Sequence, residues 1–484
     1  MNFWAFLEIA GSGTTIADYL RHFSDHFHSF GLGQKGASMK STVKLSCTLL
    51  FVFLVLGINF KPAGASSISL IAEIPIPNWV VTANPTPPPP LLTNASFDLL
   101  SFDPNRQIMY SADRPNRGVD VINTTTNTLL GIIPVPPASG GTSDPSGVQV
   151  APDLKELIVT DRGTGAAGGG VYIYDLTASA TPAAPVKSIL IPNARATDEL
   201  TYDPLNKRVY VNNTTNTGDP LGRYFMTVID ANPASATFGQ VLGQIPIAQG
   251  AASPEQPRFN PVDGNIYTTT GGNSTVLRIN PNFVLDSTNP ANNVGAILAT
   301  FAVPGCAPAG IDVNPADNLA LLGCNPGAPN GAPQELMNLS NGNIVRVIPG
   351  ITATDVLAFD PTLGEWFTAS QNLIVSNGCP ATQNGAGQFP QVGGILDNPN
   401  PGLQTACTGQ GSHGLGVDPV NNTIYVPTGI FPANATTLAG ISAAPFTGIL
   451  VFQATAVPEP SSLLLMAFGL LFVCVYAHRR SEQQ

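Results

Sequence analysis

The sequence predicts an all-β fold made of seven similar repeats. Three observations lead to this prediction: a recurring turn motif, apolar strands on either side of it, and many turn residues. The motif is a hydrophobic residue, then Asp, Asn or Ala, then Pro, and its prolines are Pro104, Pro152, Pro204, Pro261, Pro315, Pro361 and Pro419. An aromatic or aliphatic residue almost always follows six positions later, as Tyr210 follows Pro204.

The chemistry of each repeat predicts four strands. An Asx-Pro turn joins the first two, because Pro fixes φ and the Asx side chain bonds to nearby backbone. A third strand ends on Asx, as at 171–175, and a fourth often ends in Ile-Pro or Val-Pro, as at 243–246. Successive prolines are 48, 52, 57, 54, 46 and 58 residues apart, which suits one small sheet per repeat. Seven sheets of four antiparallel strands predict a seven-bladed β-propeller.

The two ends of the repeat region complement each other. Repeat seven lacks a fourth strand, whereas residues 67–77 have a fourth-strand pattern with no repeat before them. We therefore expect the N-terminal strand to close the last blade. The segments 127–135 and 209–213 resemble the YVTN family of propeller repeats. This resemblance covers roughly residues 67–455, and it implies the fold more than an activity.

Both termini carry targeting signals. Met39, Lys40 and Lys44 precede an apolar run at 45–58, and the small residues 63–65 offer a cleavage site. We predict a spurious or disordered extension at 1–38, a signal peptide at 39–65, a propeller at 66–456 and a sorting signal at 457–484.

The C-terminal segment has three parts in order. Pro458-Glu459-Pro460 precedes an apolar stretch at 463–477, and Arg479-Arg480 follow it. This arrangement resembles the PEP-CTERM sorting signal, which implies recognition and cleavage by an exosortase and delivery to the cell surface or the extracellular matrix. The hydrophobic helix is short for a permanent span, and the arginines favour the cytoplasmic side, so we expect a transient position in the inner membrane. An ordinary single-pass anchor is the alternative.

Composition agrees with an exported all-β protein. The chain of 484 residues is only 11% charged, has 48 Gly and 45 Pro, and carries a net charge of −11. This acidic balance argues against nucleic-acid binding. Exopolysaccharide or surface proteins are the partners we expect outside the cell.

Four cysteines remain when Cys47 in the signal and Cys474 in the tail are set aside. In an oxidising compartment, four cysteines suggest two disulfides. Their places around repeats five to seven predict the pairs Cys306–Cys324 and Cys379–Cys407.

Ionisable residues recur at the entrance of the inner strands. Counting back six residues from each repeat proline gives Asp98, Ser146, Asp198, Glu255, Ala309, Asp355 and His413, with Glu199 next to one of them. Converging carboxylates need a cation, a proton or water to be stable together. The simplest interpretation is that these residues supply the polar lining of a water-filled channel mouth. The alternative is a channel ring that holds a ligand or metal, with Arg195 as a counter-ion or anion contact.

Two hypotheses for function follow. The first is a non-catalytic binding or scaffold protein at the cell surface or in the matrix. The second is a metal-dependent, lactonase-like hydrolase in which Asp198, Glu255 and Asp355 bind Ca²⁺ or another divalent cation. No nucleophile elbow or phosphate-binding loop is visible, so the sequence favours the first hypothesis.

Overall fold

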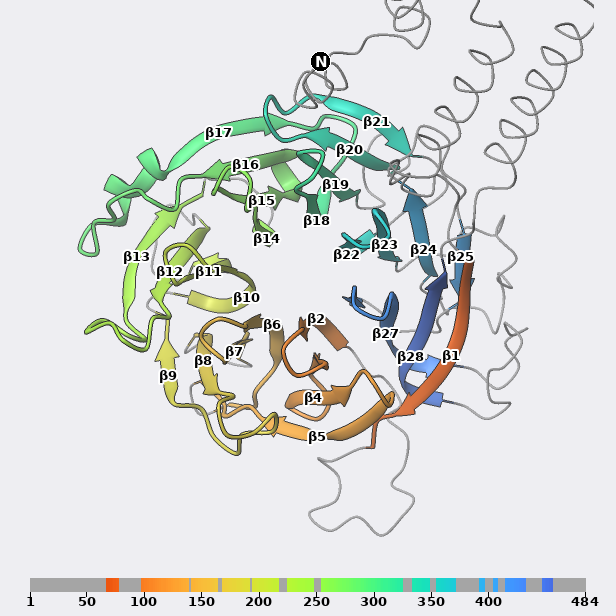
Figure 1. Ribbon diagram of the computed structural model, residues 1–484. Helices are drawn as coiled ribbons and strands as arrows, with labels where there is room; N and C mark the ends of the chain where they lie inside the picture. Colours follow the sequence, from red (N-terminus) through yellow and green to blue (C-terminus); the bar gives the residue numbers. More distant parts are fainter. Residues whose placement is uncertain are drawn as a thin grey trace, which may run out of the picture. The chain divides into compact units, whose positions relative to one another are not determined.

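In the computed structural model, seven four-stranded antiparallel sheets lie within the unit Ala63–Pro458 (Figure 1). The structure describes residues 67–77, 97–138, 141–163, 168–191, 194–216, 224–247, 254–324, 333–348, 354–370, 391–396, 404–407, 414–431 and 446–455. The predicted extension, signal peptide and sorting signal lie outside these residues.

The first four sheets follow one another along the chain. They comprise β2 (Phe97–Asp103), β3 (Ile108–Asp113), β4 (Gly118–Asn123) and β5 (Thr128–Pro134); β6 (Pro145–Ala151), β7 (Glu156–Asp161), β8 (Gly170–Asp175) and β9 (Lys187–Leu190); β10 (Ala194–Asp203), β11 (Arg208–Asn216), β12 (Phe225–Asp230) and β13 (Val241–Pro246); and β14 (Pro254–Phe259), β15 (Ile266–Thr270), β16 (Thr275–Ile279) and β17 (Ile297–Ala302). Two short 3₁₀ helices lie in the connections of the fourth sheet: η1 (Gly271–Asn273) between β15 and β16, and η2 (Pro290–Ala296) between β16 and β17.

The remaining three sheets include one that joins the two ends of the repeat region. They comprise β18 (Pro308–Asn314), β19 (Leu319–Cys324), β20 (Gln334–Asn338) and β21 (Ile344–Ile348); β22 (Thr354–Asp360), β23 (Glu365–Ser370), β24 (Gln391–Leu396) and β25 (Gln404–Cys407); and β26 (Gly416–Asp418), β27 (Thr423–Phe431), β28 (Phe446–Thr455) and β1 (Ser67–Pro75). The pairing of β1 with β28 confirms the predicted N-terminal closing strand.

The sheets are arranged as propeller blades. The first strand of each sheet contacts the first strand of the next, in the order β2, β6, β10, β14, β18, β22 and β26, and β26 contacts β2. These strands lie innermost, and strands such as β5, β9, β13 and β17 lie at the periphery (Figure 1). The all-β propeller predicted from the repeats is therefore the observed fold.

The repeated turn has one geometry throughout. The Asx Oδ1 accepts backbone N–H bonds from the residues that follow, as Asp203 does from Leu205 at 2.8 Å and Asn206 at 3.2 Å. Three residues after every repeat proline, φ is positive, at Gln107, Lys155, Lys207, Gly264, Asn318, Gly364 and Asn422. The predicted Asx turns are thus confirmed, except that Ala151 has no side-chain acceptor and its carbonyl accepts from Leu154 N instead.

Hydrogen bonds from buried tyrosine hydroxyls connect neighbouring sheets. The hydroxyls of Tyr110, Tyr210 and Tyr267 donate to carbonyls of Ala180, Pro281 and Leu339, each in the loop between the third and fourth strands of the following sheet. Tyr425 of the last sheet donates in the same way to the carbonyl of Thr124 in the first, at 3.3 Å. The aromatic position six residues after the proline therefore serves both packing and contact between blades.

One disulfide lies within the described residues. Cys306 and Cys324 are bonded, as predicted, and brace the hairpin of β18 and β19. Cys379 lies outside the described residues, so the second predicted pair, Cys379–Cys407, is not tested. No helix among the described residues is long and apolar enough to span a bilayer, and the predicted helix at 463–477 is not among them.

Candidate functional site

The inner strands are irregular at the end opposite the Asx-Pro turn. In β2, β6, β10, β14, β18 and β22, the pairing with the next strand shifts register near the position six residues before the repeat proline. A bulge bends a strand and changes the direction of its side chains. The same irregularity in six strands therefore gives the ring positions a common, non-regular backbone.

Five of the predicted polar ring residues lie at these bulges. They are Asp98 on β2, Ser146 on β6, Asp198 on β10, Glu255 on β14 and Asp355 on β22. Ala309 has the equivalent place on β18. His413 lies outside the described residues, so its predicted place in the ring is not tested.

Glycines next to the ring residues allow close contact between inner strands. A Cβ on Gly147 would lie 2.9 Å from the carbonyl oxygen of Asp198, and one on Gly310 would lie 2.2 Å from that of Asp355. On Gly414, it would lie 1.9 Å from the carbonyl oxygen of Asp98. These spacings exclude larger side chains. They hold ring residues of different sheets close together, between the last sheet and the first as well.

Arg114 connects the first two sheets at the ring. Its guanidinium forms an ion pair with Asp98 and donates to Ser146 Oγ at 3.2 Å. Its Nε lies 3.6 Å from Asp144 Oδ1. Asp98 is only 5% exposed, so this arginine supplies positive charge to a carboxylate that water hardly reaches. Opposite charges raise the pKa of Arg114, although burial acts against them.

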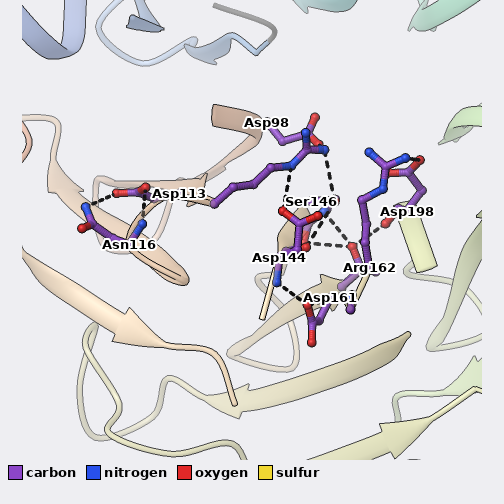
Figure 2. Close-up of polar contacts among 12 residues, drawn as sticks. Asp98, Asp113, Asn116, Asp144, Ser146, Asp161, Arg162 and Asp198 are labelled. Carbon is purple, nitrogen blue, oxygen red and sulfur yellow. Dashed lines mark hydrogen bonds and ion pairs between the residues drawn. The ribbon is translucent and has the colours of Figure 1, made fainter. Parts of the chain in front are cut away.

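Arg162 supplies the second positive charge. Its guanidinium lies 3.3 Å from Asp198 Oδ2 (Figure 2). Burial raises the pKa of Asp198, while Arg162 and then Arg114 lower it. Asp161, the residue before Arg162, accepts the backbone N–H of Asp144 at 2.5 Å and so fixes the segment that leads into β6. Both arginines therefore belong to the side of the ring made by the first three sheets.

The other side of the ring is acidic. Glu199 accepts the backbone N–H of Gln256 but has no ion pair among the described residues. The pKa of Glu199 and that of Glu255 are raised well above their usual range, first by burial and then by neighbouring carboxylates that include Asp198 and Asp355. No hydrogen bond to the Glu255 carboxylate is found within the described part of the chain. This side consequently has an excess of negative charge.

Gln256 shows where the backbone adapts to this arrangement. It is fully buried and has a φ of 22°, which is unusual for a residue other than glycine. Its Nε2 donates to the Asp355 carbonyl at 2.5 Å, so it connects β14 with β22. This contact joins two sheets that are separated along the chain by a third.

Among the described residues, no three or more His, Cys, Asp or Glu side chains form a group with metal-binding geometry. The prediction that Asp198, Glu255 and Asp355 hold Ca²⁺ or another divalent cation therefore gains no support from geometry. Asp198 and Asp355 nevertheless raise the pKa of Glu255, after burial.

Sequence reasoning missed the two counter-ions. It indicated Arg195, whose side chain is outside what the structure describes, whereas Arg114 and Arg162 make the ion pairs. A signal was present: each follows an Asp at the end of a second strand, and they are 48 residues apart, as are the first two repeat prolines. This signal lies at the ends of second strands, outside the inner strands that define the ring positions.

The comparisons with known proteins concern the C-terminus. Residues 456–480 match the PEP-CTERM protein-sorting motif. This span includes Pro458, Glu459, Pro460, Arg479 and Arg480, as predicted. No curated protein matches the chain. The fold and the motif together define an exported β-propeller protein, and the motif implies processing by an exosortase and indicates export through the cell envelope to the surface.

Proposed function

We propose that this protein is a non-catalytic binding or scaffold protein of the cell surface or extracellular matrix. The observation that carries the proposal is the acidic ring at the centre of an exported propeller. Six carboxylates, those of Asp98, Asp144, Asp198, Glu199, Glu255 and Asp355, are linked electrostatically to one another and, among the described residues, to three arginines, Arg114, Arg162 and Arg258. A ligand that brings positive charge would relieve this imbalance.

We further propose that the sheets form one closed, seven-bladed ring of the YVTN type. The contact of β26 with β2 and the Tyr425 hydrogen bond to Thr124 support closure. The Val209-Tyr210-Val211 segment within β11 supports the repeat type. In such a ring, the acidic residues lie at one mouth of the central channel.

The charge of the ring favours a particular class of partner. An anionic polysaccharide would meet like charge at Glu199, Glu255 and Asp355, whereas a polymer with amino groups would meet opposite charge. We therefore propose an amine-bearing exopolysaccharide, or a surface protein with a basic segment, as the partner. Exosortase acts earlier, on the sorting signal.

A metal-dependent, lactonase-like hydrolase is the second candidate. The observation that favours it is the electrostatic coupling of Asp198, Glu255 and Asp355, which a divalent cation would stabilise. Hydrolysis would then need the cation to polarise a substrate carbonyl. The same experiment tests both candidates.

The test is binding to the purified full chain, with and without Glu255→Gln. Oligomers of glucosamine are compared with their N-acetylated forms, and Ca²⁺, Mg²⁺, Mn²⁺ and Zn²⁺ are titrated in parallel. The double variant Asp198→Ala/Glu255→Ala is assayed for metal content and against a panel of lactones and esters. Arg117→Met is the control, because the Arg117 side chain is exposed and forms no ion pair with a described residue.

Binding of the free amine that weakens in Glu255→Gln and not in Arg117→Met would support the scaffold proposal. Stoichiometric metal that the double variant loses, together with lactone hydrolysis, would favour the hydrolase. Equal binding of amine and N-acetyl forms, with no metal, would contradict a ligand role for the ring and leave a polar channel lining.

A further inference from the structure

A second acidic site lies away from the ring, within the first sheet. Ser111 and Asp113 are on β3, and Asp120 is opposite Ser111 on β4. Their side chains share one face of the sheet, because residues two apart in a strand point the same way. Asp113, Asp120 and Ser111 are all fully buried.

This face packs against the sheet that closes the propeller. Met109 lies two residues before Ser111 and Ile122 two residues after Asp120, so both share the face of the polar residues. They belong to a cluster with Tyr425, Ile449 and Val451. The opposite face, with Tyr110 and Val121, packs against the second sheet instead. The acidic pair is therefore enclosed at the junction between the first and last sheets, beside Pro77, whose carbonyl accepts Asn116 Nδ2 at 2.9 Å.

The polar atoms of the pair are incompletely satisfied. Asp113 accepts two bonds from Asn116, from the backbone N at 3.0 Å and from Nδ2 at 2.5 Å (Figure 2). In contrast, the hydroxyl oxygen of Ser111 has no hydrogen-bond partner among the described residues, and the Asp120 carboxyl group has none except the Asp113 carboxyl group beside it. A buried carboxyl group that has only another carboxyl group as its partner, next to an unpaired hydroxyl, is costly, and these oxygens are the ligand type that hard cations prefer.

No positive charge of the surrounding strands compensates the pair. The facing strands β1, β26, β27 and β28 contain only Glu73 and Asp418 as charged residues, and β5 contains none. On β2 the charged residues are Asp98 and Asp103. In the β3–β4 loop, Arg114 points to Asp98 and Ser146, and Arg117 is exposed.

We infer that Asp113, Asp120 and Ser111 form a structural Ca²⁺ site at the junction of the first and last sheets. Two carboxylates supply the charge, and the Ser111 hydroxyl supplies a neutral oxygen ligand; these are oxygen ligands of the kind that Ca²⁺ takes, and backbone carbonyls or water would complete its roughly six to eight. The cation neutralises a pair that otherwise holds either two buried negative charges or a shared proton. Binding would thereby stabilise the junction on which closure of the propeller depends.

The experiment measures the thermal stability of the full chain at pH 7.5, after chelation and after addition of millimolar Ca²⁺. We expect Ca²⁺ to raise the Tm by about 2–4 °C, because a ligand that binds only the native state stabilises it by mass action. Asp120→Asn should abolish this shift, and Ser111→Ala should reduce it. Glu255→Gln, in the central ring, should leave it unchanged, which separates this site from the proposed function.

Three outcomes would overturn the inference. One is the absence of any Ca²⁺ effect on the parent protein, with stability rising as the pH falls from 7.5 to 5.5, which would indicate a shared proton. Another is a shift that persists in both Asp120→Asn and Ser111→Ala. The third is a shift that disappears in Glu255→Gln but not in Asp120→Asn, which would assign the cation to the ring.

Discussion

The carboxylates at the two ends of the inner strands have opposite environments. At the turn end, Asp203 and Asp418 each accept three short hydrogen bonds from residues two and three positions ahead. At the ring end, Glu255 accepts none within the described part of the chain, and its nearest charges are mainly carboxylates. Acidic residues thus stabilise the turn end of the blade and destabilise the ring end.

The largest loss of stability is expected when the arginine that pairs with a ring carboxylate is removed. Arg114→Met should lower the free energy of unfolding by about 3 kcal/mol at pH 7, because it leaves a buried carboxylate without its opposite charge. Chemical denaturation measures this change. Acid that protonates carboxylates should shrink the loss. Arg117→Met is the matched control, and an equal loss there would contradict a specific role for Arg114.

At the turn end, Asp203→Ala should cost about 2 kcal/mol, because the backbone donors of Leu205 and Asn206 lose their acceptor. Asp203→Asn keeps an acceptor oxygen and should cost about half as much. Denaturant midpoints at pH 7 measure both. If the two variants were equally unstable, the negative charge rather than the turn geometry would matter.

At the ring end, replacing a carboxylate with a neutral side chain should raise the free energy of unfolding near neutral pH, whereas at the turn end it lowers it. Glu255 has a raised folded-state pKa, so its protonated form stabilises the protein below the unfolded pKa, and this contribution is lost as the pH rises through the folded pKa. Glu255→Gln should therefore match the parent near pH 4 and exceed its stability by about 1 kcal/mol at pH 7.5.

Asp175 provides the comparison of sign for that experiment. It is exposed, and hydrogen bonds from Thr177 lower its pKa, so Asp175→Asn should slightly destabilise the protein above the unfolded pKa of aspartate. Stability profiles between pH 4 and 8 measure both variants. If the stability profile of Glu255→Gln ran parallel to that of Asp175→Asn, the ionised Glu255 carboxylate would not destabilise the folded protein.

The smallest loss in the free energy of unfolding, about 0.5 kcal/mol, is expected for Arg162→Met. Its side chain is 33% exposed, so solvent screens its pair with Asp198, and Arg114 continues to favour the ionised Asp198. The measurement is the same denaturation at pH 7. A loss as large as that of Arg114→Met would show that the two arginines contribute equally.

Features with a period were predictable from the sequence. Each Asx-Pro turn, each aromatic residue six positions later and the closing strand 67–75 follow from local chemistry repeated at similar intervals. The places of Asp98, Asp198 and Glu255 at the start of inner strands were predictable for the same reason.

Features without a period were not. Arg114 and Arg162 occur in two repeats only, and their contacts depend on how neighbouring sheets pack. Gln256 combines burial with a positive φ, which its residue type does not suggest. Asp120 stands between Val119 and Val121, where alternation indicates a face but not what that face meets.

The closing sheet also constrains the order of events during secretion. β1 comes from the beginning of the repeat region and β28 from its end, and they pair along almost their whole length, from Ser67 with Thr455 to Pro75 with Gly448. A chain that emerges from its N-terminus first cannot form this pairing until residue 455 has crossed. The matched sorting motif begins at residue 456, so the last strand of the sheet and the sorting signal are adjacent in the chain.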